Sequence, residues 1–361
     1  KEGEFKSWGD KLEKPSTYNP LDFFQTGFNT MNSIAVSTGT ETNQTHISFG
    51  AVNSEGIIDN NKYNRYNFTF RNSWDIVKNV LSMDMGLFYI KQNNQNSNGQ
   101  GMYYNPLVPI YLFPPSDDIN KYAVYERYDA DRNFKTQYWP YGNQGLGMQN
   151  PYWIINRNMF NTDRDRYIIS LSMKWNITNW LNIIGRARID NAYTDFERKL
   201  YASTDGLFAK SQGNYMNQED KNTSTYLDFL VNVDKKFGEN YHLLVNLGGS
   251  FYDEKYKSDT FEGNLVGVPN FFHPSNIPST ESNYNKSELH TQTQSIYGKA
   301  EIGYRNFLYA DVTGRIDWFS TLVGTSKEYV CYPSAGLSVI LSEILPLPEK
   351  IISFWIICTS W

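Results

Sequence analysis

The side chains that most often carry enzyme chemistry are few in this chain and are not grouped. The four histidines, which lie far apart, are His46, His242, His273 and His290. None of them belongs to a His-Glu-x-x-His motif, the arrangement that holds a zinc ion. The two cysteines, Cys331 and Cys358, have no metal-ligand spacing and cannot make a disulfide framework. The sequence therefore predicts no catalytic residue, no metal site and no cofactor.

Three glycines and two short acidic segments are weaker candidates. Gly142, Gly145 and Gly147 do not have phosphate-loop spacing, and no Lys-Ser or Lys-Thr follows, so we expect ordinary loop glycines. The segments 129–131 (DAD) and 163–166 (DRDR) contain carboxylates that could bind a cation. Alternating charges at the entrance of a strand more often pair or face water, and we expect that here.

Aromatic side chains in a long link at 93–163 are the strongest binding candidates. The link begins in a polar stretch, contains several prolines, and a short helix is expected near 117–127. Its aromatic content argues against disorder, so we expect it to fold over one end of the molecule. Because aromatic rings can stack on the C–H faces of sugars, five residues are predicted to contact ligand: Tyr103, Tyr104, Trp139, Tyr141 and Trp153. The same rings could instead form the core of the link or a docking surface for a partner.

The elements that position these residues are long strands with strict alternation. In 308–318 the apolar set is Leu308, Ala310, Val312, Gly314, Ile316 and Trp318, and the residues between them are mostly polar. Alternation over eleven residues exceeds the ~5–6 residues of most soluble strands and suits the ~9–11 residues of a tilted strand that crosses a membrane. About eleven strands are predicted: 26–38, 43–53, 63–73, 79–92, 167–177, 181–190, 226–234, 241–252, 297–305, 308–318 and 331–342.

The fold class predicted is therefore all-β, an antiparallel transmembrane β-barrel present in part. The connections alternate between short turns and longer links, the longer ones near 54–62, 93–163, 198–221, 257–290 and 321–330. Outer-membrane barrels alternate in this way, with tight periplasmic turns and long extracellular loops. Aromatics beside the short turns predict an interfacial girdle: Trp74, Trp175, Trp180, Phe237, Tyr241, Tyr304 and Phe307.

In such a barrel the polar set of each strand faces the lumen. Five charged residues are predicted to face it: Arg186, Arg188, Asp190, Asp311 and Arg315. Charges are costly on the lipid face and tolerated in a wet lumen. Ion pairs within the wall, or contacts that hold a plug domain, are favoured over direct contact with substrate.

Composition agrees with this class and excludes others. The chain has 361 residues, of which 16% are aromatic and 40% hydrophobic, and it contains no apolar run of 18 residues. A formal charge of −5 provides no basic field, so nucleic acid is an unlikely partner. No signal peptide follows Lys1, and we expect a fragment that begins inside a longer polypeptide.

Several segments, in the expected order, resemble the SusC/RagA family of TonB-dependent outer-membrane transporters. The first two pairs are NPLDFFQTG at 19–27 with NSIAVS at 32–37, and NSEGII at 53–58 with NRYNF at 64–68. The third group is NFLY at 306–309 with DVTGR at 311–315, followed by DW at 317–318, STL at 320–322 and YPS at 332–334. Ile316 and Phe319 depart from the family pattern. After Glu343 the resemblance fades, and 351–358 is apolar on both faces, so no functional role is expected there.

The resemblance implies that 1–361 is part of a plugged barrel of about 22 strands. It implies a plug and a TonB-contacting segment before Lys1, further strands after the chain, and long extracellular loops such as 93–163. The expected location is the outer membrane of a Gram-negative cell, in contact with its lipid. The expected partners are TonB and a SusD-like surface lipoprotein, and the expected function is import of oligosaccharides or peptides without enzymatic chemistry.

Two other classes remain open on the residues alone. A secreted all-β adhesin or glycan-binding protein would have shorter strands and an apolar face covered by a second sheet. A polysaccharide-degrading enzyme would need two carboxylates about 5–10 Å apart. Glu126 and Asp129 are a pair of this type, but they lie in the long link, where the sequence does not place them relative to each other.

Overall fold

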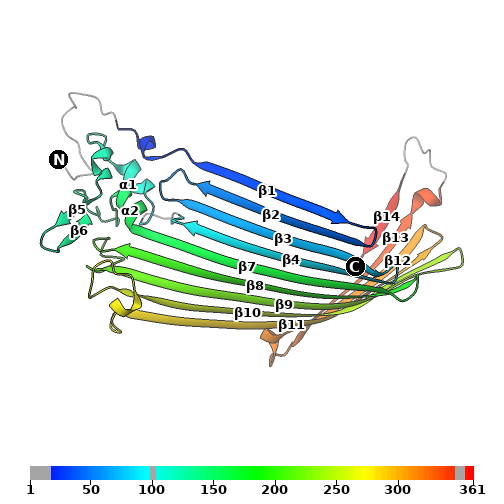
Figure 1. Ribbon diagram of the computed structural model, residues 1–361. Coiled ribbons are helices and arrows are strands. Elements are labelled where there is room, and N and C mark those ends of the chain that lie inside the picture. The colour runs from blue at the N-terminus through cyan, green and yellow to red at the C-terminus, as the bar shows by residue number, and fades with distance from the viewer. Residues whose placement is uncertain (1–17, 98–102, 346–353) are drawn as a thin grey trace.

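The computed structural model describes residues 18–97, 103–345 and 354–361. Its main feature is one antiparallel sheet of 12 strands, each hydrogen-bonded to its neighbours in sequence order (Figure 1). The strands of this sheet are β1 (Phe28–Gly39), β2 (Asn43–Glu55), β3 (Lys62–Val77), β4 (Leu81–Gln95), β7 (Asn158–Asn176), β8 (Leu181–Tyr201), β9 (Gly213–Phe237), β10 (Tyr241–Asn264), β11 (Ser282–Tyr304), β12 (Leu308–Phe319), β13 (Tyr329–Ile340) and β14 (Ile356–Ser360). Within the described residues the sheet does not close, because β1 and β14 each pair with one strand only.

The remaining elements are short and lie in the connections. They are η1 (Pro20–Phe23), α1 (Leu107–Leu112), η2 (Ile119–Ala123), a two-stranded sheet of β5 (Glu126–Asp129) and β6 (Phe134–Gln137), α2 (Pro151–Arg157), η3 (Pro274–Asn276), η4 (Ser320–Leu322) and η5 (Leu341–Glu343). No helix in the described part of the chain is both long and apolar enough to cross a membrane.

The predicted fold class is confirmed, and the strands are longer than predicted. Strands β7 to β11 contain 19 to 25 residues, so the links predicted at 198–221 and 257–290 shrink to 202–212 and 265–281. The extra residues lie at the ends near the long links, where polar side chains occupy both faces and leave no apolar alternation in the sequence.

Turn length separates the two ends of the sheet. At one end the strands are joined by tight turns, as between β11 and β12, where Arg305 and Asn306 have φ values of 49° and 61°. Two consecutive residues with positive φ are the mark of a type I′ turn, whose twist matches that of the flanking strands. The links after β2, β4, β8, β10 and β12 lie at the other end, together with η1, α1 and α2 (Figure 1). The link from β13 to β14 is an exception, because β13 ends at Ile340 beside the β11–β12 turn and η5 follows it there.

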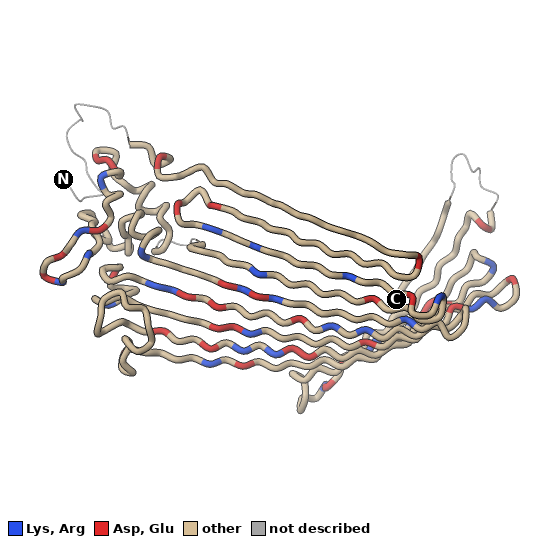
Figure 2. Tube along the Cα trace, in the orientation of Figure 1, with Lys and Arg blue, Asp and Glu red and all other residues tan. Residues whose placement is uncertain are grey.

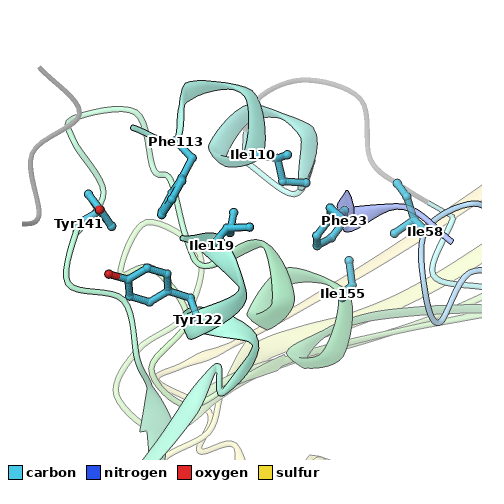
Figure 3. Packing of buried hydrophobic residues seen from close by; sticks show 8 residues of the cluster. All are labelled: Phe23, Ile58, Ile110, Phe113, Ile119, Tyr122, Tyr141 and Ile155. Carbon is cyan, nitrogen blue, oxygen red and sulfur yellow. The ribbon is translucent and has the colours of Figure 1, made fainter. Parts of the chain in front are cut away.

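The predicted link 93–163 shortens to 96–157, since β4 extends to Gln95 and β7 begins at Asn158, and its described residues 103–157 form a folded subdomain. The helix expected near 117–127 is the short 3-10 helix η2, which ends before β5 begins at Glu126. Buried apolar side chains from this link pack with side chains of η1 and of the 56–61 link (Figure 3): Phe23, Ile58, Ile110, Phe113, Ile119, Tyr122, Tyr141 and Ile155. We call residues 103–157 the loop subdomain.

The C-terminal end joins the sheet through one short strand. Strand β14 pairs with β13 from Ile340↔Ile356 to Gly336↔Ser360, and all its residues are exposed. The apolar segment predicted to lack alternation, 351–358, falls partly on 346–353, which lie outside the described residues.

Candidate functional site

One face of the sheet is apolar and uncovered. In β7, Ile169, Leu171 and Met173 point to this face and are 48%, 37% and 39% exposed. Their cross-strand partners continue it, as in the row Leu87↔Ile169↔Ile189. A protein in water would bury such a surface under a second layer, and the described elements provide none. This apolar face fits a surrounding of hydrocarbon.

Aromatic side chains gather on this face and around the turns at the end with short connections. Trp74, Trp175 and Tyr241 are 43%, 51% and 50% exposed there. Around the turns Tyr304 contacts both Tyr241 and Phe307, with ring centroids 5.1 and 5.7 Å apart. Amphipathic rings with one wet end are typical of the boundary between lipid and water.

The opposite face of the sheet is polar and carries ion pairs both between neighbouring strands and between residues i and i+2 of one strand. Charges are sparse along β1 to β4 and frequent along β7 to β11 (Figure 2). Arg166 donates two hydrogen bonds to Asp190 across the β7–β8 pair, at 2.8 and 2.6 Å, and Arg188 donates a third at 3.1 Å. Asp190 is therefore shared by two guanidinium groups.

A second carboxylate, Asp228 of β9, is fully enclosed on the same face. Its side chain is 0% exposed and accepts hydrogen bonds from Arg186 at 2.7 Å and from the Tyr226 hydroxyl at 3.0 Å. The Tyr297 hydroxyl donates to it as well. A carboxylate with this many donors holds Arg186 in place, as a structural ion pair does.

The other predicted lumen charges also lie on the polar face. Arg315 donates to Asp317 at 2.7 Å and to the Ser295 hydroxyl at 3.0 Å. Asp311 of β12 lies over Gly336 of β13, where a Cβ atom would meet its Oδ1 at 2.4 Å. The five residues thus share one face but form several separate contacts.

The loop subdomain has its own half-buried polar centre at Asp117. Its carboxylate accepts hydrogen bonds from Lys121 and Tyr122, both at 2.6 Å, and from Tyr141 at 2.9 Å. Burial by itself would raise the pKa of Asp117, but these donors and the backbone N–H of Asp118 outweigh it and lower the pKa to about 2. Burial and the bond to Asp117 raise the pKa of the Tyr122 and Tyr141 hydroxyls.

The five aromatics predicted to contact ligand differ widely in exposure. Trp153 is 1% exposed and donates to the Thr204 hydroxyl at 3.1 Å, and Tyr141 is 3% exposed. Trp139 packs against Tyr141 with a centroid distance of 5.1 Å, and Tyr104 packs against Phe208 at 4.8 Å. Tyr103 is 42% exposed, although its ring also touches Phe208. In this conformation Trp153 and Tyr141 serve the core of the subdomain, and Tyr103 offers the most open ring.

The weaker sequence candidates have ordinary structural roles. Glu126 is paired with Arg157 at 2.8 Å and Lys135 at 3.2 Å, and Asp129 accepts from backbone N–H groups of its own turn. Asp163 accepts a hydrogen bond from Asn93 at 2.9 Å. No group of three or more possible metal ligands is found among the described residues.

One residue of the polar face escaped the sequence analysis. Arg71 of β3 lies beside Gly86 of β4, Ser170 of β7 and Arg188 of β8 in one row across the sheet, and these side chains line a pocket of about 550 Å³. The only sequence signal was that Arg71 falls in the polar set of a predicted strand. Which residues it meets depends on the register of four strands.

A single-layer sheet of long strands, apolar on one face and polar on the other, is the wall of a membrane β-barrel. Known structures contain the same fold. The RagAB peptide importer in its open-open state aligns with a TM-score of 0.74 and 15% identity, over 96% of this chain and 38% of that one. Its closed-closed state aligns with a TM-score of 0.72 and 14% identity, over the same shares.

A more distant match has the same architecture. The open form of the ferric-catecholate import receptor Fiu from E. coli K12 aligns with a TM-score of 0.52 and 12% identity, over 87% of this chain and 51% of that one. No family model matches the sequence, and no curated protein sequence matches it.

The resemblance to SusC/RagA transporters is thus confirmed at the level of the fold. This chain spans between a third and about half of the structures that it matches.

Proposed function

We propose that this chain forms part of the wall of an outer-membrane, TonB-dependent importer of peptides or oligosaccharides. In this proposal the apolar face lies against lipid, the polar face lines the lumen, and the loop subdomain stands on the extracellular side. A SusD-like lipoprotein would sit on the extracellular side, and TonB would act from the periplasm through a segment outside this chain. Passage of substrate, and not bond chemistry, is the activity.

The observation that carries the proposal is the match of nearly the whole chain to the wall of RagAB, described as a peptide importer. The chain supplies the physical reasons independently: exposed apolar side chains on one face, ion pairs on the other, and the folded 103–157 link at the end opposite the tight turns. Each property is expected of a wall between lipid and water.

The alternative of a secreted adhesin or glycan-binding protein would need a second layer over the apolar face. Main-sheet strands of 12 to 25 residues, β14 excepted, and an uncovered apolar face favour the importer. For ligand contact we propose Tyr103 as the primary residue, with Tyr104 and Trp139 at the edge of the same subdomain. Tyr141 and Trp153 would act by holding the subdomain in shape.

The test is to express the full-length parent protein and measure outer-membrane recovery and the gel shift on boiling. Uptake of a labelled peptide mixture and of a labelled oligosaccharide mixture is then measured with and without the proton-motive force. Outer-membrane recovery with energy-dependent uptake supports the proposal, and the mixture taken up identifies the substrate class. A soluble product without a mobility shift contradicts it and favours the adhesin.

A further inference from the structure

A pocket on the polar face contains more positive charge than its ion pairs neutralise. Arg71 contacts the face of Phe88, with its guanidinium carbon 5.0 Å from the ring centroid, and makes no described ion pair. Arg188 contributes a single bond, at 3.1 Å, to an Asp190 that Arg166 already engages twice, and its side chain is 51% exposed. Both therefore keep N–H donors directed at neither a carboxylate nor a backbone carbonyl.

The local charges support this conclusion. The arginines in and beside the pocket are Arg71, Arg166, Arg186 and Arg188. The carboxylates are Asp84, Asp190 and Asp228, of which Asp84 accepts a hydrogen bond from Ser73 at 2.5 Å. Four positive charges against three negative ones leave an excess of one positive charge. A concave site with an excess of positive charge concentrates anions.

The floor of the pocket is kept open by small residues. Between Arg71 and Arg188 in the cross-strand row lie only Gly86 and Ser170. A Cβ atom at position 86 would lie 2.6 Å from Ser170 Oγ and 3.3 Å from the Phe88 ring. Glycine here leaves the recess open between Arg71 on β3 and Arg188 on β8, which lie at its two ends three strands apart. Arginine is the side chain best suited to bind a planar carboxylate, through two parallel N–H donors.

We propose that the recess between Arg71 and Arg188 binds a carboxylate group. The proposal rests on the proposed function, because only in a barrel does this face line the lumen. The carboxylate can come from a polypeptide segment that fills the lumen or from an imported solute. The chemistry of recognition is the same in both cases. The two sources differ in whether the recess is open to a reagent in solution.

The experiment places a reactive thiol on the floor of the recess. In the full-length protein, Cys331 and Cys358 are replaced by serine, and Ser170→Cys is introduced, with Ser172→Cys as a second position. The thiol is treated with an anionic methanethiosulfonate (the ethylsulfonate) and with a cationic one (the ethyltrimethylammonium). Each rate is divided by the rate of the same reagent with free cysteine. Boiling-dependent gel mobility of the same samples reports whether the barrel is formed.

Two results support the carboxylate site. In an open recess the normalised rate for the anionic reagent exceeds that for the cationic one by about tenfold, and Arg71→Gln and Arg188→Gln each reduce this ratio toward one. This result assigns the carboxylate to an imported solute. In an occupied recess the thiol is protected from both reagents until Arg71→Gln or Arg188→Gln exposes it. That result assigns the carboxylate to a lumen-filling segment.

The matched control is Arg65→Gln, on the same strand and the same face. Arg65 donates to Asn67 at 2.8 Å and does not line the recess, so its variant should leave the ratio or the protection unchanged. Equal normalised rates for the two reagents, or a preference or protection that survives both arginine changes, would overturn the proposal. A mobility shift absent from every sample would instead count against the barrel, whatever the labelling.

Discussion

The loop subdomain buries its apolar side chains, whereas the main sheet leaves those of one face exposed. In the subdomain Ile110, Ile119 and Trp153 are 0%, 0% and 1% exposed, as in a small water-soluble domain. In the sheet Ile169, Leu247 and Val312 are 48%, 57% and 56% exposed, with no described layer over them. The subdomain buries its apolar side chains in a core that Phe23 and Ile58 complete, and the sheet requires a hydrocarbon surrounding to complete its burial.

The difference implies that the two regions can be destabilised separately. Damage to the core of the subdomain should leave the barrel intact, and damage to the apolar face should prevent barrel assembly.

The largest effect is expected from Trp153→Ala in the subdomain. The change removes a buried ring and the hydrogen bond to Thr204, and should destabilise the subdomain by about 3–5 kcal/mol. In the full-length protein we expect proteolytic cleavage within 96–157 while the gel shift on boiling persists. If the shift disappears together with the cleavage resistance, the two regions are one cooperative unit and cannot be destabilised separately.

The next effect is expected from Val312→Arg on the apolar face of β12. An arginine facing hydrocarbon costs about 2–4 kcal/mol near the middle of a bilayer, so outer-membrane recovery should fall. The matched control is Thr313→Arg, one residue along the same strand and on the polar face, where the charge can stay hydrated. Equal losses for the two variants would mean that the faces are not lipid and lumen.

A smaller effect is expected when Asp117 is protonated. Its pKa of about 2 in the folded subdomain lies below the ordinary 3.8, so its contribution is complete above about pH 4 and is lost as the pH falls toward 2. The contribution is about 2 kcal/mol, since one pKa unit corresponds to about 1.4 kcal/mol. Cleavage within 96–157 should rise over this range in the wild-type protein. In Asp117→Asn the subdomain should be weakened already at pH 7. If acid increases the cleavage of this variant as much as that of the wild type, the pH effect belongs to other groups.

Sequence alone predicted the membrane-crossing parts of the strands because each face there meets a different solvent. The 308–318 run, which β12 matches, shows this directly. The same rule failed for the first half of β9, from Gly213 to about Thr225, where both faces are polar and no alternation appears. Helices α1 and α2, of 6 and 7 residues, are too short to display a helical period.

The candidate sites divide along the same physical lines. Strand parity alone placed Arg186 and Asp190 on the polar face, where the structure has them. Arg71 was not found, because its pocket depends on Ser170 and Arg188, far along the chain, reaching the same row of the sheet. The aromatics of the long link were recognised as a set, but hydrophobicity does not tell a buried ring such as Trp153 from an open one such as Tyr103.

The smallest effect on stability is expected from Tyr103→Ala, which tests whether the exterior of the subdomain has a role of its own. Tyr103 is 42% exposed, so its removal should change stability by less than about 1 kcal/mol and leave cleavage within 96–157 unaltered. If its ring stacks on substrate, uptake at low substrate concentration should fall about three- to tenfold, because an aromatic contact contributes about 0.5–1.5 kcal/mol. Tyr128→Ala is the control, since Tyr128 is 64% exposed on the separate β5–β6 hairpin and should not alter uptake. Equal uptake in all three proteins would exclude Tyr103 as a substrate contact and leave the subdomain surface free for the proposed lipoprotein.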